Sequence, residues 1–362
     1  MSARPSWVRW VTPALLAIAI VALALTIRSV GLHTLGRYLR LIGWWWIAVA
    51  ALEIFNTTLH STALRAFAAP DKLSLRDAFL AQLAGRAVNA VTPSGNLGEV
   101  VKMSVLTDVV TPSRAVSTVL LYNVVSFTIE LGIVAIAAPF FALLVPMPLG
   151  FRILFLGVGV LCLAASIGLY ALVRRGMLAS LAKVPVKLHL ISQARYAGWY
   201  EKLHAIDEKL RLTSGASRRE RIIGIFALTL SRMSALLLSL LILRAVGASI
   251  SFGFVAAWTV GSFPIYLAST LVPMGVGVSE GGYYGLFRTL GYNPALAVTL
   301  VIARRCITLM YATIGLLLVT FSETVKRARA RHREIQVTTP TAVSSIPMAI
   351  VVVEKRGEVS PS

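Results

Sequence analysis

A short motif of proline, glycine and a carboxylate occurs twice in an otherwise apolar chain. Residues 93–99 read PSGNLGE, and residues 273–280 read PMGVGVSE. Pro93 recurs as Pro273 and Glu99 as Glu280, at spacings of 180 and 181 residues. The flanking sequences recur at spacings of 179 and 182 residues: Leu64-Arg65-Ala66 as Leu243-Arg244-Ala245, and Ala115-Val116 as Ala297-Val298. Because the spacing changes so little, the pattern predicts a duplicated half-molecule whose copies each carry a polar, glycine-containing interruption.

The composition indicates where the two copies lie. Hydrophobic residues make up 57% of the chain and charged residues only 14%, whereas soluble domains carry roughly 25% charged residues. Several apolar runs reach about 20 residues, which is enough for a helix to cross the hydrocarbon core of a bilayer. The sequence therefore predicts an all-α polytopic membrane protein.

The apolar runs predict about six full spans, with two interrupted segments between them. The expected spans are residues 11–27, 41–64, 114–138, 151–173, 222–246 and 293–320. The interrupted segments, about 77–107 and 250–290, are expected to form re-entrant hairpins broken by proline and glycine; whether residues 250–272 span fully or re-enter stays open. We expect a transmembrane domain over residues 1–322, with repeat one at about 41–138 and repeat two at about 222–320. A basic, disordered tail is expected over 323–362.

The charges of the connecting segments predict the orientation. The loop at residues 174–221 carries eleven basic and four acidic residues, and such loops lie on the cytoplasmic side. Counting spans from this loop places both termini in the cytoplasm and opens the two interrupted segments from opposite sides. We therefore expect two inverted-topology repeats in the cytoplasmic (inner) membrane.

The same basic loop contains a short amphipathic pattern. Its apolar residues recur every three or four positions: Tyr196, Trp199, Leu203, Ile206 and Leu210. A helix lying on the anionic inner leaflet is the expected form, and the seam of a homodimer is the alternative. The net charge of +20 is attributed to such lipid-facing regions, and no nucleic-acid partner is expected because aromatic residues are not interleaved with the basic ones.

The interrupted segments are the expected functional elements. A broken helix exposes backbone N–H and C=O groups, which persist at membrane depth only inside protein or beside a wet cavity. The residues expected to break the helices are Pro93, Gly95, Gly98, Pro273, Gly275 and Gly277. For Gly98 and Gly281, close helix packing is the alternative reading.

Polar residues around the two interruptions are the predicted substrate-binding residues. They are Arg86, Asn89, Glu99, Lys102, Glu280, Arg304 and Arg305. A charge at mid-membrane costs about 2.5–3.5 kcal/mol on insertion scales, so Glu99 and Glu280 are expected to pair with Arg86, Arg304 or Arg305. A cavity with an excess of arginine would suit a phosphate headgroup; a purely structural ion pair is the alternative. Glu53, Asn56 and His60 form a polar stripe that lines either a cavity or a helix–helix seam.

The two motifs also resemble the signature of a known family. The stretch from Gly85-Arg86-Ala87-Val88-Asn89 to Glu99, and the stretch from Pro273 to Glu280 with Arg304 beyond it, are similar to the lysylphosphatidylglycerol synthase transmembrane-region family, also called flippase-like membrane proteins. The resemblance covers most of residues 10–320 and implies movement of lipids between leaflets. Full-length synthases carry a soluble aminoacyltransferase domain, whereas only about forty residues follow Phe321 here, so the resemblance does not imply lysine transfer.

Together these features predict a translocase that moves a phospholipid or isoprenoid-linked lipid through a polar cavity between the repeats. No enzymatic activity, cofactor or metal is expected, because no catalytic constellation is recognisable and the two cysteines lie in apolar runs without metal-ligand spacing. Two alternatives remain open: a membrane-embedded lipid-modifying transferase, and a non-transporting scaffold of an envelope-lipid pathway such as that of hopanoids.

Overall fold

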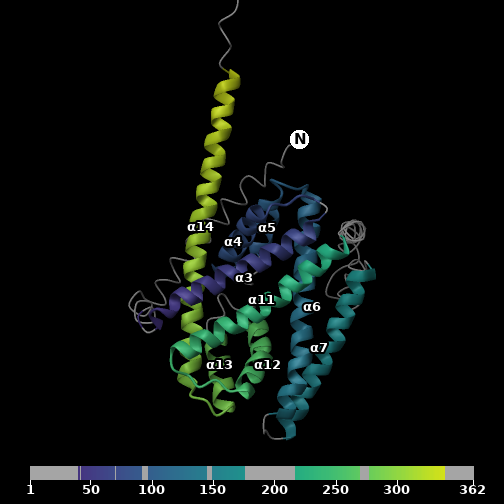
Figure 1. Cartoon of the computed structure of the whole chain (residues 1–362), viewed down its shortest axis with the longest axis vertical. Coiled ribbons are helices and arrows are strands. Elements are labelled where there is room, and N and C mark those ends of the chain that lie inside the picture. The colour runs from purple at the N-terminus through teal and green to yellow at the C-terminus, as the bar shows by residue number, and fades with distance from the viewer. Residues whose placement is uncertain are drawn as a thin grey trace, which may run out of the picture. The chain divides into compact units, whose positions relative to one another are not determined.

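The structure is a computed structural model that describes residues 40, 42–69, 71–91, 97–144, 149–175, 217–269 and 277–338. It comprises two units, Met1–Val319 and Thr320–Ser362. All elements of the described residues are helical (Figure 1). They are α3 (Trp45–Ala68), α4 (Leu75–Val91), α5 (Leu97–Leu106), α6 (Pro112–Leu144), α7 (Leu149–Arg175), α11 (Arg218–Ala245), α12 (Phe252–Ser269), α13 (Val278–Thr289) and α14 (Pro294–Thr338). The predicted all-α class is confirmed for this part of the chain.

Local sequence signals explain where several helices begin. Ser217 and Glu220 form a capping box at the start of α11, which satisfies two backbone N–H groups that the helix leaves unpaired. Pro112 and Pro294 are the first residues of α6 and α14, where a missing N–H has no cost. At the other end, α14 continues to Thr338, so the region predicted as tail from Glu323 starts as helix.

Four of the described helices are long and apolar enough to cross a membrane: α6, residues 152–171 of α7, α11, and residues 294–315 of α14. They coincide with four of the six expected spans. The expected span at 41–64 forms helix α3 but is not among the four, because Glu53, Asn56 and His60 reduce its apolar character. The expected span at 11–27 lies outside the described residues, as does most of the basic loop.

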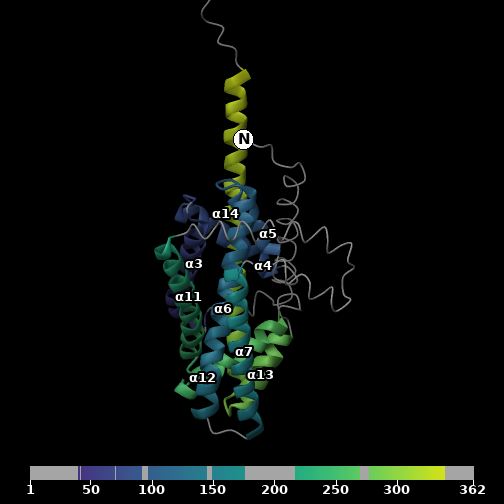
Figure 2. The ribbon, with the colours of Figure 1, turned by 90° about the vertical axis from the view of Figure 1, so that its right-hand side faces the viewer.

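Helices α3 and α11 pack side by side in antiparallel directions (Figures 1 and 2). Val49, near the start of α3, shares a core cluster with Leu238, near the end of α11. Phe67, at the end of α3, packs directly against Gly224, near the start of α11. Between these contacts, the Asn56 side chain donates a 2.7 Å hydrogen bond to the Ser231 carbonyl. Part of the predicted polar stripe is therefore a helix–helix seam.

Two helical hairpins surround the predicted interruptions. In the first, α4 ends at Val91 and α5 begins at Leu97; Gly98 lies against Gly85 and Asn89, while Lys102 lies against Gly85. Later residues of α5 therefore contact earlier residues of α4, which means that the two helices are antiparallel. In the second, α12 and α13 are antiparallel as well, since Leu286 packs on Gly261 and Ile265 packs on Gly282. Pro93, Gly95, Pro273 and Gly275 lie outside the described residues.

Long helices cover these hairpins. Helix α6 packs along α7, with the Phe141 and Phe155 rings in an edge-to-face contact at 4.7 Å between centroids. It also packs against α12, where Leu131 and Phe263 share a core cluster. On the other side, Gly315 of α14 lies against α4 so closely that an added Cβ would come 2.8 Å from the Ala87 Cβ.

Candidate functional site

One polar cavity among the described residues, called pocket 1 here, has a volume of about 360 Å³. Helices from before and after the basic loop build it: α3, α4, α5 and α6 on one side, α11 and α12 on the other. Its lining residues are His60, Asn89, Glu99, Lys102, Tyr122, Asn123, Ser126, Phe127, Glu130, Arg232 and Tyr266. A cavity of this size accommodates one small ligand or headgroup.

The Glu99 carboxylate is the most heavily bonded group in pocket 1. Its Oε1 accepts hydrogen bonds from Lys102 Nζ at 2.9 Å and from Asn89 Nδ2 at 3.2 Å, and its Oε2 accepts one from Asn123 Nδ2 at 2.7 Å. The Asn89 Oδ1 accepts a further bond from the Gly98 N–H at 2.6 Å. Asn89 therefore joins the end of α4 to the start of α5, and it orients Glu99 at the same time.

Lys102 is unusually buried for a lysine, with 4% of the residue exposed. Its stem lies against the bare backbone of Gly85, where an added Cβ would come 2.4 Å from Lys102 Cγ. Its ammonium group lies 5.1 Å from the centre of the Tyr122 ring, within cation–π range. Burial of the charge is tolerated because Glu99 and the ring both face it.

A second ion pair links the two halves of the chain across pocket 1. Arg232 of α11 lies 3.2 Å from Glu130 of α6 and donates a hydrogen bond to the Ser126 hydroxyl at 2.7 Å. Nearby, the Tyr122 hydroxyl and the His60 Nδ1 are 2.7 Å apart. Among the residues that the structure describes, pocket 1 thus has two acids and two bases, which form two ion pairs.

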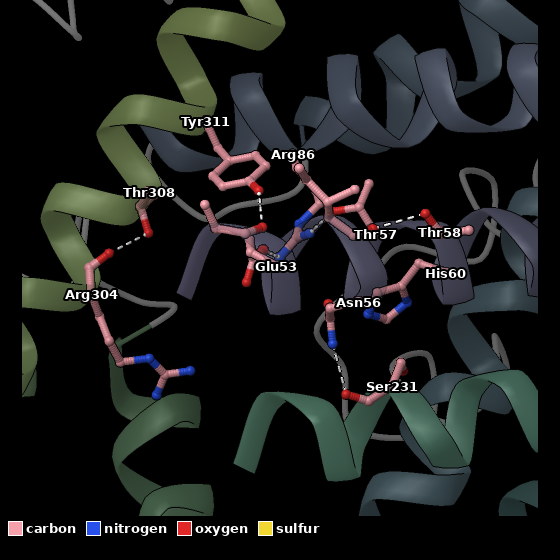
Figure 3. Close-up of polar contacts among 12 residues, drawn as sticks. Glu53, Asn56, Thr57, Thr58, His60, Arg86, Ser231, Arg304, Thr308 and Tyr311 are labelled. Carbon is pink, nitrogen blue, oxygen red and sulfur yellow. Dashed lines mark hydrogen bonds and ion pairs between the residues drawn. The ribbon is translucent and has the colours of Figure 1, made fainter. Parts of the chain in front are cut away.

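A smaller cavity, pocket 2, has a volume of about 120 Å³ and lies between α3, α4, α11 and α14 (Figure 3). Arg86 crosses from α4 to α3, where it pairs with Glu53 at 2.5 Å and donates a hydrogen bond to the Thr57 hydroxyl at 2.6 Å. The Arg304 guanidinium extends from α14 into this region. Among the described residues this guanidinium has neither an ion pair nor a hydrogen bond, so the described lining of pocket 2 has a net positive charge.

Glu280 stabilises the N-terminus of α13. Its Oε2 accepts a hydrogen bond from the Gly277 N–H at 2.8 Å, and its Oε1 pairs with Arg305 of α14. Gly277 has φ of +82°, a conformation that favours glycine, which explains its place at the predicted break. Neither Glu280 nor Arg305 is among the residues that line the two pockets.

The predicted site residues thus fall into three places. Asn89, Glu99 and Lys102 meet in pocket 1; Arg86 and Arg304 line pocket 2. The pairing of Glu280 with an expected arginine, Arg305, is confirmed. The prediction of an arginine partner for Glu99 was wrong, because Lys102, one helical turn away, forms the ion pair with Glu99.

Sequence reasoning missed several residues of pocket 1, chiefly Arg232, Asn123 and Tyr266. A signal for Arg232 was present, because it lies 179 positions after Glu53, the spacing of the flanking repeat. The two occupy equivalent places with opposite charges, and each forms an ion pair. In the described part of the chain, no group of histidine, cysteine and carboxylate side chains is arranged to hold a metal ion.

Comparison with known protein families gives a match over most of the chain. The family model for the lysylphosphatidylglycerol synthase TM region matches residues 14–315. No curated protein and no solved structure matches the chain. The family match covers both interrupted segments and all residues that line the two pockets, and the chain therefore belongs to the lysylphosphatidylglycerol synthase TM region family.

Proposed function

We propose that the protein is a lipid translocase, which moves a phospholipid or isoprenoid-linked lipid between the leaflets of the inner membrane. The observation that carries the proposal is pocket 1, a polar cavity lined by ion pairs in a chain of apolar helices. Charged groups at membrane depth are costly and persist where they face a partner or a wet cavity. A lipid headgroup needs such a polar path, while its acyl chains remain in the bilayer.

The order of the helices supports a duplicated architecture. Before α7 and the basic loop, a long helix, a hairpin with a short second helix and another long helix follow one another (α3, α4–α5, α6). After the loop the same order returns (α11, α12–α13, α14). The repeated sequence motifs occupy equivalent positions, since Glu99 and Glu280 both lie in the first turn of the short helix.

The packing between the halves supports inversion of one copy relative to the other. The equivalent helices α3 and α11 lie antiparallel, as required for elements related by a two-fold axis in the membrane plane. The contacts are also reciprocal, because α4 packs on α14 while the equivalent α12 packs on α6. Such exchange of partners is the signature of a two-fold interface. Inverted halves allow one rocking motion to expose a pocket to each side in turn.

The predicted site residues receive roles within this scheme. Glu99, Asn89 and Lys102 hold the first hairpin and line the path of the headgroup, whereas Glu280 and Arg305 fix the second hairpin to α14. Arg86 and Arg304 supply positive charge in pocket 2. Transport in this proposal involves no covalent chemistry, and both termini face the cytoplasm. A homodimer formed through the basic loop remains part of the proposal.

A leaflet-resolved assay tests the proposal. Fluorescent lipid analogues with headgroups of several classes are placed in proteoliposomes, and an impermeant quencher measures their movement. We expect wild-type protein to accelerate movement of at least one class, and Arg232→Gln to slow it roughly tenfold, because loss of a charged hydrogen-bond donor costs about 1.5–3 kcal/mol. Arg219→Gln, which alters an exposed residue at the start of α11, is the matched control. Wild-type vesicles that move no lipid faster than protein-free vesicles would refute the proposal.

A further inference from the structure

The charges that the described residues contribute to pocket 1 cancel within the pocket. Glu99 pairs with Lys102, and Glu130 pairs with Arg232. Lys102 is also fixed between Gly85 and the Tyr122 ring. A net-charged headgroup entering this pocket would lose water without gaining a free counter-charge, or would have to break an existing pair, and both are unfavourable. Pocket 1 therefore disfavours the anionic headgroup that the sequence predicts.

Among the described residues of pocket 1, the groups that lack a hydrogen bond include both donors and acceptors. Arg232 bonds Glu130 and Ser126 through one nitrogen, Nη2, so its Nη1 N–H groups are donors without a hydrogen bond in the described part of the chain. Glu130 Oε1 and Asn123 Oδ1 are acceptors that make no hydrogen bond within the described ranges, and the Tyr266 hydroxyl, equally without a bond there, both donates and accepts. A phosphate oxygen only accepts and an ammonium only donates, whereas a hydroxyl does both. The free groups therefore match a ligand with several hydroxyls.

Aromatic side chains supply the rest of the lining. Tyr122, Phe127 and Tyr266 place ring surfaces in a cavity that is otherwise polar. Aromatic faces and a few convergent polar groups together fix a small ligand that has both apolar and polar surfaces. A sugar ring has this character, with C–H groups on its faces and hydroxyls at its edge. The volume of about 360 Å³ restricts the pocket to a small headgroup.

We infer that pocket 1 takes an uncharged, polyhydroxylated headgroup, such as the sugar of a glycolipid, in preference to an anionic or zwitterionic one. The inference rests on the proposed translocase function, but it replaces the phospholipid named there with a glycolipid as the substrate of pocket 1. The Glu130–Arg232 pair determines the selectivity, because it keeps the described lining neutral while leaving one carboxylate oxygen and the Nη1 N–H groups of Arg232 for ligand hydroxyls.

The test compares three lipids with the same fluorescent acyl chain: a monohexosyl diacylglycerol, phosphatidylethanolamine and phosphatidic acid. Each is measured separately with the impermeant quencher in proteoliposomes of the full chain. We expect the sugar lipid to move about tenfold faster than either phospholipid, equivalent to about 1.4 kcal/mol. If a phospholipid moves as fast or faster, the inference is wrong while the proposed function stands. If no lipid moves faster than in protein-free vesicles, both fail.

A charge substitution provides an independent readout. Glu130→Gln leaves Arg232 without its partner and gives the lining a net charge of about +1. We expect the ratio of sugar-lipid to phosphatidic-acid movement to fall about tenfold relative to wild type. Glu220→Gln removes the carboxylate of the capping box at the N-terminus of α11, which does not line pocket 1, and it should leave the ratio unchanged. A ratio that is the same in Glu130→Gln as in wild type would overturn the assigned selectivity, and circular dichroism verifies that both variants are folded.

Discussion

The contact between Gly85 and Gly98 provides a sharp test of the first hairpin. An added Cβ on Gly98 would lie 2.0 Å from the Gly85 carbonyl oxygen and 2.4 Å from Asn89 Oδ1. Both distances are far shorter than a van der Waals contact. The nearest atom belongs to the backbone of α4, so no side-chain rotation relieves the clash. We therefore expect Gly98→Ala to force α4 and α5 apart.

The cost is estimated from three contributions. Overpacking costs about 1–3 kcal/mol, and a clash against backbone belongs at the upper end of that range. Weakening of the 2.6 Å hydrogen bond from the Gly98 N–H to Asn89 adds about 1 kcal/mol. The higher helix propensity of alanine offsets about 1 kcal/mol. The expected loss in the free energy of unfolding is therefore about 3 kcal/mol.

Reversible unfolding in mixed micelles, followed by tryptophan fluorescence and circular dichroism, measures this free energy. The matched control is Gly285→Ala in the middle of α13, where an added Cβ meets no atom within 4 Å. We expect this control to be neutral or to stabilise by up to about 1 kcal/mol. If Gly98→Ala is as stable as Gly285→Ala, the tight packing of α4 on α5 is incorrect.

Three further predictions concern buried polar groups. A double-mutant cycle of Lys102→Met and Glu99→Gln should give a coupling energy of about 1–3 kcal/mol in the same unfolding assay, and additive effects would contradict the ion pair. Arg114→Gln should lower the free energy of unfolding by about 1–2 kcal/mol, because this guanidinium donates hydrogen bonds to the last carbonyls of α3; a loss below about 0.5 kcal/mol would speak against that role. Cys162 and Cys306 are both buried, so a maleimide should label them only after denaturation, and fast labelling of the folded protein would show the packing to be wrong.

Periodicity and apolar length were sufficient to predict most of the described helices. The run at 114–138 lies within α6, and the run at 222–246 ends one residue beyond α11. Both were predictable because a span needs only a long apolar stretch and a polar flank. The sequence also predicted the two interruptions. Helix α4 ends at Val91 and α12 ends at Ser269, close to the prolines that were expected to break the helices. Such signals are local, and they are visible without knowledge of the packing.

The partners within the pockets depend on packing between distant helices. The Glu130–Arg232 pair joins residues 102 positions apart, and no local pattern selects that combination among the charged residues. The Glu99–Lys102 pair, by contrast, follows the three-residue spacing of neighbours on one helix face. The sequence analysis nevertheless expected an arginine as the partner of Glu99. The burial of Lys102 further depends on the absence of a side chain at Gly85, which only the packed hairpin reveals.

The most direct test of the inverted architecture is the sidedness of the two hairpins. Lys72 and Ser249 are exposed residues that lie shortly before α4 and α12. Each is replaced by cysteine in a background with Cys162→Ala and Cys306→Ala, and an impermeant thiol reagent is applied to sealed vesicles from either side. The account predicts that Lys72→Cys reacts only from the cytoplasmic side and Ser249→Cys only from the opposite side. Reaction of both cysteines from the same side would contradict inverted repeats.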